Sequence, residues 1–583
     1  MNEQEILKIK NELESLPKGT ITHKKISGKI RTYLQWRENG KYKSIYLKES
    51  DVSKYNNLIV RRKELENKLK ELESYNLNID VSYNLNVVTN NELRNMCEVV
   101  NNYDRRDCYQ NLFDYLIHDY RGKVLLLYGL RRTGKTTLIF QAINQLQYDK
   151  CAYIKINTSN NMSMVTKDLD ILYKQGYKYI FIDEITLLED FIDTAAVLSD
   201  IYSMLGMKIV LSGTDSLGFV FADRNELYDR NIMIHTSYIP FKEYSRLLKI
   251  DSIDSYIEYG GTLKKENMDF SDSEYKLDEV SFKDDESTRK YIDSSISRNI
   301  QHSLKNDKYG QGFKGLKELY DNNELTNVIN RVIENMNHEF LLKVITEKFK
   351  SHDLGSTRQI LLHNNNHILY DINTDVVIDK LKELIEIKDK EETNIEINKT
   401  HLKEIKEYLI LLDLIKTVKI RYSDGYVEDY AIFTQPGMRY SIGKALVYSL
   451  LQDKYFNSIS ENDKEYIINK ILEDVKGRML EDIVLLDTCL KKDYKDVFKY
   501  RFNTGEFDMV TYERYIPSFN IYEIKHSDKI DDNQIKHLCN DDAINELAHK
   551  YGNLNKKYVL YRGKSLEKDN IIYKNVEEYL KNN

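Results

Sequence analysis

The chain has 583 residues, which suits roughly three or four domains, and its formal net charge of −7 argues against a protein that coats nucleic acid. None of its apolar runs reaches the 18 or so residues of a membrane-spanning helix, and its first residues lack the pattern of a signal peptide. Its five cysteines form no Cys-x-x-Cys pair, so we expect a cytoplasmic protein with neither structural zinc nor disulfides.

Residues 1–75 are expected to form a small basic module of a β-hairpin and a helix. The first 70 residues carry 17 Lys and Arg against 9 Asp and Glu. Alternating strands at 30–36 and 42–47 flank a turn at Asn39 and Gly40, and a charged helix with a leucine stripe follows at about 51–73. Basic and aromatic side chains on the hairpin permit contact with DNA; the alternative is a small sheet with an aromatic core.

Residues 76–100 are rich in Asn and are interpreted as a linker, and residues 101–250 are predicted to form an α/β domain. Apolar strands alternate there with helical stretches, which is typical of a parallel sheet covered by helices on both faces. The strands are expected at 124–128, 151–156, 179–183, 208–212 and 232–235. An acidic, polar insertion at 251–290 is interpreted as a loop, and residues 291–475 are predicted to be mostly helical.

A phosphate-binding loop follows the first of these strands. The segment Gly129-Leu130-Arg131-Arg132-Thr133-Gly134-Lys135-Thr136 has the pattern GxxxxGK[ST] between an apolar strand and a helix. Its glycines allow backbone N–H groups to face phosphates, and the helix N-terminus adds positive potential. Lys135 is expected to contact the phosphates of ATP, and Thr136 to ligate Mg²⁺. The predicted nucleotide-binding residues are Gly129, Arg132, Thr133, Gly134, Lys135, Thr136 and Thr137.

Two further strand ends are expected to complete the ATP site. Asp183 follows an apolar strand and is predicted to hold Mg²⁺, directly or through water, while Glu184 polarises the attacking water. Thr214, with Ser212 as the alternative, is predicted to contact the γ-phosphate or the water. That contact requires the third strand to be inserted between the first two.

These residues resemble an AAA-type family of archaeal and bacterial P-loop ATPases with the loop G-x-R-R-x-G-K-T. Two later motifs of the family are matched by Tyr238-Ile-Pro240-Phe241-Lys-Glu243-Tyr244 and Tyr256-Ile-Glu-Tyr-Gly260-Gly261. The family has an aromatic residue and Pro after the glycine pair, where this chain has Thr262 and Leu263. The resemblance covers roughly residues 100–565. It implies ATP hydrolysis, a winged-helix-like segment and a C-terminal restriction-endonuclease-like domain.

The resemblance also implies partners. AAA-type sites often use a neighbouring subunit's arginine, so a homo-oligomer is one expected arrangement. Arg230, or else Arg224, is the candidate for that arginine, although surface ion pairing explains either residue equally well. The winged-helix-like segment is expected as a helix at 405–415 and strands at 418–421 and 429–433, where it serves either DNA binding or packing.

Residues 476–583 are predicted to form a PD-(D/E)xK nuclease-like domain in the order αβββαβ. Asp508 on the second strand and Glu523 on the third are expected to share Mg²⁺, with Glu481 on the first helix as a further ligand. Because side chains alternate along a strand, Glu523 and Lys525 share one face, and Lys525 can orient water or stabilise charge on a phosphate. The strands are expected at 498–502, 506–512, 519–525 and 557–561, with the second helix from about Asp531 carrying Gln534.

Three functions fit these patterns. The first is an ATP-controlled nuclease acting on DNA, for which only the resemblance implies a setting in phage defence or a mobile element. The second is a signalling or scaffold ATPase that binds a protein partner and carries a catalytically silent nuclease fold. The third is a DNA-remodelling motor without cleavage. Each predicts an α/β protein that binds ATP and Mg²⁺.

Overall fold

The computed structural model has an α/β fold and two compact units, Met1–Asn84 and Leu85–Asn583. Within the residues described, the strands form a three-stranded, a six-stranded and an eight-stranded sheet. No helix among these residues is long and apolar enough to span a bilayer. The structure describes residues 2–26, 29–38, 41–77, 82–263, 281–297, 300–301, 304, 313–348, 379–380, 382–384, 397–452, 454–458, 460–530 and 535–582.

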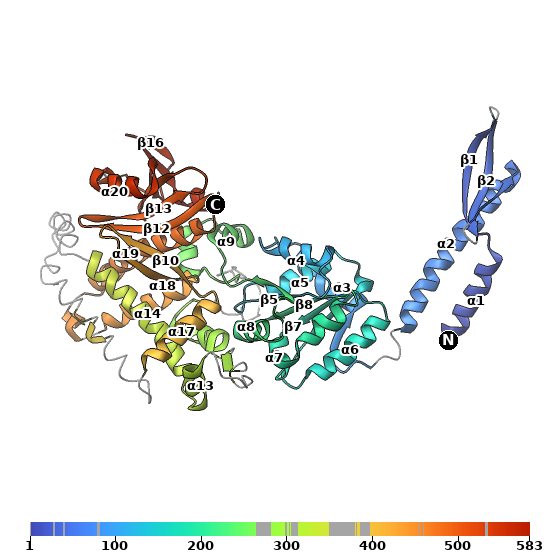
Figure 1. Cartoon of the computed structure of the whole chain (residues 1–583), viewed down its shortest axis with the longest axis horizontal. Helices are drawn as coiled ribbons and strands as arrows, with labels where there is room; N and C mark the ends of the chain where they lie inside the picture. The colour runs from blue at the N-terminus through green and yellow to red at the C-terminus, as the bar shows by residue number, and fades with distance from the viewer. Residues whose placement is uncertain are drawn as a thin grey trace. The chain divides into compact units, whose positions relative to one another are not determined.

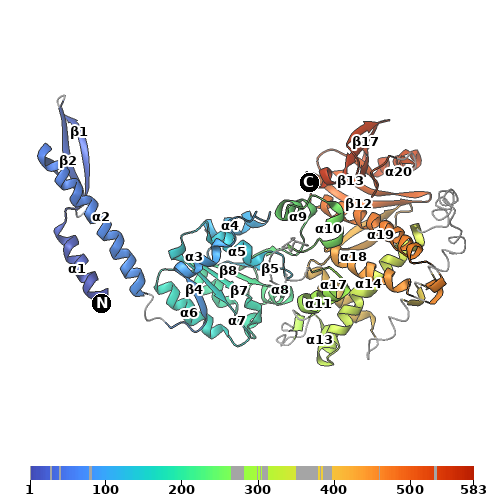
Figure 2. The same ribbon diagram turned by 180° about the vertical axis from the view of Figure 1, so that it is seen from behind.

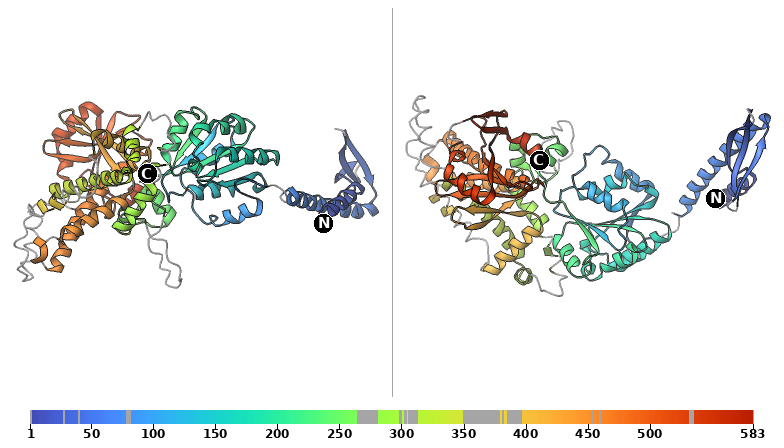
Figure 3. Two further views of the ribbon diagram at one scale, coloured as in Figure 1. Left: turned by 90° about the horizontal axis from the view of Figure 1, so that it is seen from below. Right: turned by 45° about the horizontal axis from the view of Figure 1, so that its top comes forward.

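The N-terminal unit is a three-stranded antiparallel sheet with two helices (Figure 3). Its elements are α1 (Asn2–Ser15), β1 (Thr20–Ile26), β2 (Lys29–Glu38), β3 (Lys41–Leu47) and α2 (Glu49–Leu77). Buried Leu34, Leu47 and Ile59 pack α2 on the sheet, and Ile9 packs α1 against Leu65 of α2. The expected hairpin and long helix are present, although the turn residues lie outside the described part. The sequence interpretation missed α1 and β1, because β1 is largely polar.

The six-stranded sheet has the order β4-β6-β7-β8-β5-β9 and is parallel except for β4. Figure 1 shows α3, α4 and α5 on one face and α6, α7 and α8 on the other. The strands are β4 (Asn86–Thr89), β5 (Val124–Tyr128), β6 (Cys151–Lys155), β7 (Tyr179–Asp183), β8 (Lys208–Gly213) and β9 (Asn231–His235). The helices are α3 (Asn90–Glu98), α4 (Tyr109–Ile117), α5 (Lys135–Ile143), α6 (Met162–Lys174), α7 (Phe191–Thr194) and α8 (Ser216–Arg224).

Two expectations for this sheet meet different outcomes. Strand β8 lies between β7 and β5, as the interpretation of Thr214 and Ser212 required. The linker prediction for 76–100 is wrong from Asn86 onward, because β4 pairs with β6 and α3 buries Leu93 and Cys97 in the core of the sheet. The Asn-rich composition hid the short alternating strand.

The described ends of the acidic stretch 251–290 contain helices where a loop was predicted. Helix α10 (Ile253–Tyr259) follows α9 (Phe241–Leu248), and α11 (Asp285–Ile292) begins after the N-cap Asp284. Several acidic residues of the stretch lie in the first turns of helices, where they favour the helix dipole. At the described ends, acidic residues therefore marked helix starts, whereas residues 264–280 lie outside the described part.

The remaining helices and strands form one large assembly with α9 and α10. The helical part has α13 (Lys314–Asp321), α14 (Leu325–Lys348), α17 (Lys399–Leu411), α18 (Pro436–Leu450) and α19 (Glu461–Cys489). The eight-stranded sheet has the order β11-β10-β12-β13-β14-β15-β17-β16. Its strands and helices are β10 (Ile415–Tyr422), β11 (Val427–Phe433), β12 (Tyr494–Phe502), β13 (Gly505–Glu513), β14 (Ser518–Ile524), α20 (Asp541–Tyr551), β15 (Asn553–Tyr561), β16 (Leu566–Lys568), β17 (Ile571–Asn575) and α21 (Val576–Lys581).

The elements α19, β12, β13, β14, α20 and β15 follow the predicted order αβββαβ. The structure differs from expectation in the place of one hairpin and in two boundaries. The expected helix and hairpin are present as α17, β10 and β11, but β10 pairs in parallel with β12, so the hairpin is part of this sheet and not a free wing. The boundary predicted at residue 476 falls inside α19. Gln534 lies outside the described residues, and α20 begins only at Asp541.

A hydrophobic core joins the end of the ATPase segment to this assembly. Tyr238, Phe241 and Tyr256 are buried together with residues of α18, α19 and the eight-stranded sheet. Figure 2 shows α9 and α10 next to α18 and α19. By its packing, the chain from Tyr238 onward therefore contributes to the second core, which begins within the segment 101–250 predicted for the ATPase domain.

Candidate functional site: a phosphate-binding loop and a carboxylate cluster

The phosphate-binding loop joins the end of β5 to α5. Gly129 and Gly134 have φ values of +148° and +87°, which L side chains rarely adopt. A Cβ on Gly129 would lie 2.6 Å from Thr236 Oγ1. Both glycines are therefore needed for the path of the loop, as the pattern predicted.

Lys135 is folded back onto this loop. Its Nζ donates hydrogen bonds to the carbonyl oxygens of Gly129 at 2.8 Å and Leu130 at 2.9 Å. Burial lowers the Lys135 pKa to about 8, although Glu184 and Asp183 act in the opposite direction. The ammonium group is thus held at the loop by weak acceptors, which the phosphates of a nucleotide can replace.

The ends of β7 and β8 bring the predicted acidic and hydroxyl groups together. Asp183 accepts hydrogen bonds from Thr136 Oγ1 at 3.2 Å, from Tyr153 Oη at 2.8 Å and from Ser212 Oγ. Thr214 Oγ1 donates to Glu184 Oε2 at 3.3 Å. The hydroxyl of Ser212 on β8 thus contacts the first carboxylate, and that of Thr214, directly after β8, contacts the second.

Three predicted nucleotide-binding side chains point elsewhere. Thr133 Oγ1 donates to the Leu130 carbonyl at 2.8 Å and is fully buried, so its side chain supports the loop from within. Arg132 Nη1 donates to Ser281 Oγ at 2.8 Å. The Arg230 carbonyl pairs with Val124 N at the start of β5, at the edge of the sheet opposite the loop, and its guanidinium pairs with Asp200. Arg230 therefore does not reach the phosphate site of its own chain.

The predicted Thr137 lies in the first turn of α5, directly after the proposed Mg²⁺ ligand Thr136.

A buried ion pair that the sequence interpretation missed supports the loop. Arg106 donates from Nε and Nη2 to the two carboxylate oxygens of Glu243, each at 2.9 Å. Arg106 also donates to the carbonyls of Thr133 at 2.7 Å, Thr236 at 2.6 Å and Tyr238 at 2.9 Å. This arginine thus connects the loop to the Pro-Phe-x-Glu motif, which the sequence showed only as a family resemblance.

The second candidate site lies where α19 meets β13 and β14. Carboxylate oxygens of Glu481, Glu506 and Asp508 lie within 4.8 Å of one another. Lys525 Nζ lies 2.5 Å from Glu523 Oε1 and 3.9 Å from Asp508 Oδ2. The four residues that the sequence predicted here are therefore neighbours, and Glu506 joins them. Glu506 precedes Asp508 by two residues on one strand, so period-two alternation would have placed both on one face.

Basic side chains surround these carboxylates. Glu481 accepts hydrogen bonds from Lys499 Nζ at 2.9 Å and Arg478 Nη1 at 2.6 Å, and Glu506 accepts one from Arg501 Nε at 2.8 Å. Lys499 is fully buried and Arg478 is 3% exposed. The sequence interpretation missed these basic residues, because their partners lie 3 to 28 positions away along the chain with no motif linking them.

The electrostatics of the cluster favour a bound cation. Burial, followed by repulsion from neighbouring carboxylates, raises the pKa of Asp508 and raises that of Glu523 to about 8. Although burial alone would lower the Lys525 pKa, Asp508 and Glu523 raise it above its ordinary value. Glu523 Oε2 is buried and has no hydrogen-bond partner among the described residues.

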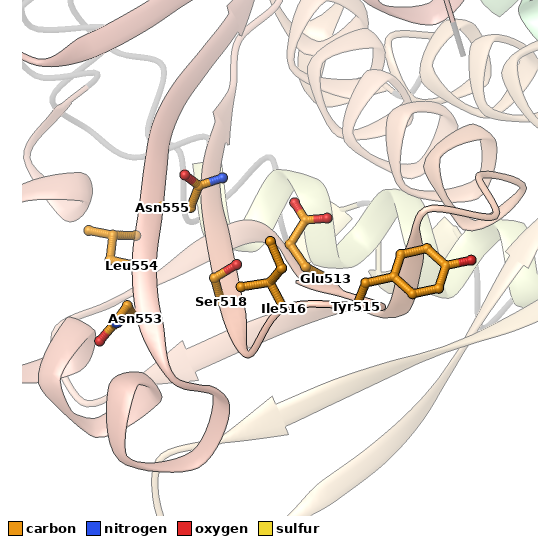
Figure 4. Close-up of a pocket in the computed structure, with 7 residues that line it drawn as sticks. All are labelled: Glu513, Tyr515, Ile516, Ser518, Asn553, Leu554 and Asn555. Atoms are coloured by element: carbon orange, nitrogen blue, oxygen red, sulfur yellow. The ribbon is translucent and has the colours of Figure 1, made fainter.

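A separate cavity of about 440 Å³ lies at the turn between β13 and β14. Figure 4 shows its lining residues, which include Glu513, Tyr515 and Ser518. Asp508 and Glu523 lie toward the other ends of these two strands, since Asp508 accepts a hydrogen bond from Ile524 N at 2.7 Å. This cavity is therefore distinct from the carboxylate cluster.

Comparison with known proteins assigns the segment around the phosphate-binding loop to a domain family. Residues 121–245 match the family model of an AAA domain, and residues 2–57 match a domain of unknown function, DUF6788. The uncharacterized protein MJ1544 of Methanocaldococcus jannaschii is 26% identical over 240 residues, which are 39% of this chain and 52% of that protein. The chain thus spans about half the length of this curated relative.

A solved structure of the Aeropyrum pernix ORC1 protein in complex with DNA aligns with 63% of this chain and 93% of its own, at 13% identity and a TM-score of 0.19. The AAA match, the phosphate-binding loop and the inserted strand β8 together define an AAA-type P-loop ATPase domain within the chain.

Proposed function

We propose that the chain is an ATP-controlled, Mg²⁺-dependent nuclease that acts on DNA. The observation that carries the nuclease part is the convergence of Glu481, Glu506 and Asp508 within 4.8 Å beside the Glu523–Lys525 pair. Carboxylates on neighbouring strands with a lysine two residues after one of them suit phosphodiester hydrolysis. DNA is proposed because the resembling ATPase family carries a restriction-endonuclease-like domain.

The donor set fits Mg²⁺. All the candidate ligands are carboxylate oxygens, which are the donors that this hard cation prefers. The unpartnered Glu523 Oε2 and the raised pKa values of Asp508 and Glu523 support a cation that relieves their mutual repulsion. A bound Mg²⁺ would supply a Lewis acid and a more acidic water. Glu481, Asp508 and Glu523, together with Glu506, would hold it.

Lys525 would act on the substrate. Its ammonium lies between Glu523 and Asp508 and keeps its proton because both carboxylates raise its pKa. A protonated lysine there would stabilise negative charge on a phosphate oxygen, or orient a water molecule by donating a hydrogen bond to it.

In the ATPase domain, Thr136 and Asp183 would hold the Mg²⁺ of the nucleotide, and Glu184 would polarise the attacking water. The 3.2 Å bond between Thr136 and Asp183 supports a shared metal. Thr214 would position Glu184 through the contact already present. An arginine supplied by a second copy of the chain, with Arg230 as the candidate, remains a prediction, as do a homo-oligomer and a cytoplasmic location.

A buried contact supports control of one site by the other. On α19, Asp487 accepts a hydrogen bond from Tyr238 Oη, and another from Phe241 N at 3.0 Å. Tyr238 is also linked to the phosphate-binding loop, since Arg106 donates to the carbonyls of both Tyr238 and Thr133. Glu481 lies six residues before Asp487 on the same helix, a rise of about 9 Å. A nucleotide that shifts the loop would thereby bias the position of α19.

A scaffold ATPase with a silent nuclease fold remains the second candidate. It is favoured by the fact that Lys499, Arg478 and Arg501 already pair with Glu481 and Glu506. Such a network satisfies the buried carboxylates without a metal and would serve stability alone.

Cleavage of circular plasmid DNA in Mg²⁺ separates these candidates. We expect the wild-type protein to cut and Asp508→Asn to be inactive, whereas Glu513→Gln, at the far end of the same strand, cuts normally. Equal cleavage by the wild type and Asp508→Asn would sink the nuclease assignment. No cleavage by the wild type with ATP hydrolysis intact would favour the scaffold.

A further inference from the structure

A second, smaller cavity lies beside α19. It measures about 240 Å³ and is lined by residues of α14, α17, β11, α18 and α19. This volume is below the roughly 300–1,000 Å³ of pockets for drug-sized ligands. The cavity therefore suits a small group, such as a phosphate with part of a sugar.

Arg478 lines this cavity and has an unused donor. Its Nη1 is bonded to Glu481 and lies 3.4 Å from Glu506. Its Nη2 is buried and has no hydrogen-bond partner among the described residues, in a side chain that is 4% exposed. A buried guanidinium donor without a partner is costly, and a rotation of the guanidinium that brought Nη2 onto an anion in the cavity would remove that cost.

The other lining groups suit a phosphate with an attached organic part. Lys343 of α14 and Lys406 of α17 add two cations, and the Phe340 and Tyr430 rings form an aromatic wall. Two carboxylates, Glu339 and Asp429, also line the cavity. Asp429 is paired with Lys419 outside the lining, so its charge is largely compensated.

Arg439, the remaining cation of the lining, is already committed. It pairs with Asp482 at 3.0 Å and lies 4.1 Å from the centroid of the Phe340 ring. The donors left for a ligand are therefore Arg478 Nη2, Lys343 and Lys406.

We propose that this cavity binds a phosphate group, with Arg478 as the buried donor and Lys343 and Lys406 at the outer side. The phosphate belongs either to a nucleic-acid strand or to a free nucleotide-sized compound. Its assignment to a nucleic-acid substrate rests on the proposed nuclease function, because Arg478 directly holds two members of the carboxylate cluster. The phosphate site itself does not depend on that function.

The test measures binding and needs no catalysis. The full chain carries Lys135→Ala, so that the ATPase loop does not contribute, and EDTA removes metal. The probes are pyrophosphate, by calorimetry, and a 12-nucleotide single-stranded DNA, by fluorescence anisotropy. The test variants are the charge reversal Lys343→Glu with Lys406→Glu, at the outer side of the cavity, and Arg478→Lys, which keeps a cation beside Glu481.

The matched control is Lys403→Glu, on the same helix as Lys406. Lys403 has a side chain that is 77% exposed, pairs with Glu407 at 3.8 Å and does not line the cavity. We expect the double reversal and Arg478→Lys to weaken binding about tenfold or more, the loss expected for charge-assisted contacts. The control should stay within about twofold.

Weaker binding of DNA in the test variants supports the site and a nucleic-acid strand as its ligand. Weaker binding of pyrophosphate alone supports the site and a free phosphate compound. No binding of either probe, or a double reversal that behaves like Lys403→Glu, overturns the proposal. DNA cleavage is followed in the same variants with Lys135 restored and Mg²⁺ added. Absent cleavage with cavity-dependent binding intact counts against the nuclease function and not against this site.

Discussion

Glu243 places both of its carboxylate oxygens on the guanidinium of Arg106, at 2.9 Å each, and the two residues are 137 positions apart. Their side chains are 4% and 6% exposed. Through the same guanidinium, Arg106 holds carbonyls of the phosphate-binding loop and of the segment that enters the second core. This ion pair therefore fixes the ATP site relative to the helix that follows it.

Breaking this pair should destabilise the protein. Glu243→Gln leaves a buried guanidinium without its counter-charge, and we expect a loss of about 3 kcal/mol in the free energy of unfolding. Urea denaturation of the wild type and of Glu243→Gln measures this difference in the free energy of unfolding. The control is Asp107→Asn, which removes the exposed partner of Arg246 nearby and should cost less than about 1 kcal/mol. Equal effects of the two substitutions would show that the buried pair has no special role.

A substitution of Glu184 should slow ATP hydrolysis without weakening ATP binding. Glu184→Gln keeps the size of the side chain but cannot polarise water, so we expect kcat to fall about a hundredfold or more with ATP affinity nearly unchanged. Thr214→Ala, which removes the hydroxyl bonded to Glu184, should give a smaller loss of the same kind. Steady-state phosphate release and equilibrium binding of a fluorescent ATP analogue measure the two quantities. A large loss of affinity in Glu184→Gln would contradict the assigned role.

Nucleotide binding should take up a proton at alkaline pH. In the nucleotide-free protein the Lys135 pKa is lowered to about 8 by burial, and bound phosphates would raise it again. Below pH 8 the lysine is already protonated. Above pH 8, nucleotide binding requires that Lys135 take up a proton. The affinity for ATP should therefore fall with rising pH, by a factor that approaches about ten per pH unit. Calorimetry at pH 9 in buffers of different ionisation enthalpy measures the uptake, and a value near zero would contradict the prediction.

The carboxylate cluster should bind divalent cations. We expect Glu506→Gln and Asp508→Asn each to weaken Mn²⁺ binding about tenfold or more, the range found even for residues that only support a ligand. Titration of the Mn²⁺ electron paramagnetic resonance signal, in the Lys135→Ala background, measures the affinity. Glu513→Gln, on the same strand beyond the cluster, is the control. Unchanged affinity in Glu506→Gln would remove this residue from the site.

Local patterns in the sequence predicted the ATPase sheet well. The strands expected at 124–128 and 179–183 have those bounds in the structure, because each is a continuous apolar run that ends in a motif. The inserted position of β8 also agrees with the motif interpretation. The loop motif did not reveal which of its side chains point inward, such as that of Thr133.

The contacts between distant segments could not be predicted in the same way. Arg106 pairs with Glu243, and Asp487 accepts from Tyr238, which lies 249 positions away. Such pairs leave no periodicity and no motif in a single sequence, since each residue alone looks like an ordinary charged or polar side chain. Glu506 is different, because its position two residues before Asp508 on a strand was a readable signal.

The central claim is that ATP controls cleavage of DNA, and one plasmid assay tests it most directly. Wild type, Lys135→Ala, Asp508→Ala and Tyr238→Phe are incubated with linear and circular DNA and Mg²⁺, with and without ATP. We predict that cleavage disappears in Asp508→Ala, that it responds to ATP in the wild type but not in Lys135→Ala, and that Tyr238→Phe cuts and hydrolyses ATP with a weakened response. Wild-type cleavage that is the same with and without ATP, and the same in Lys135→Ala, would contradict the account.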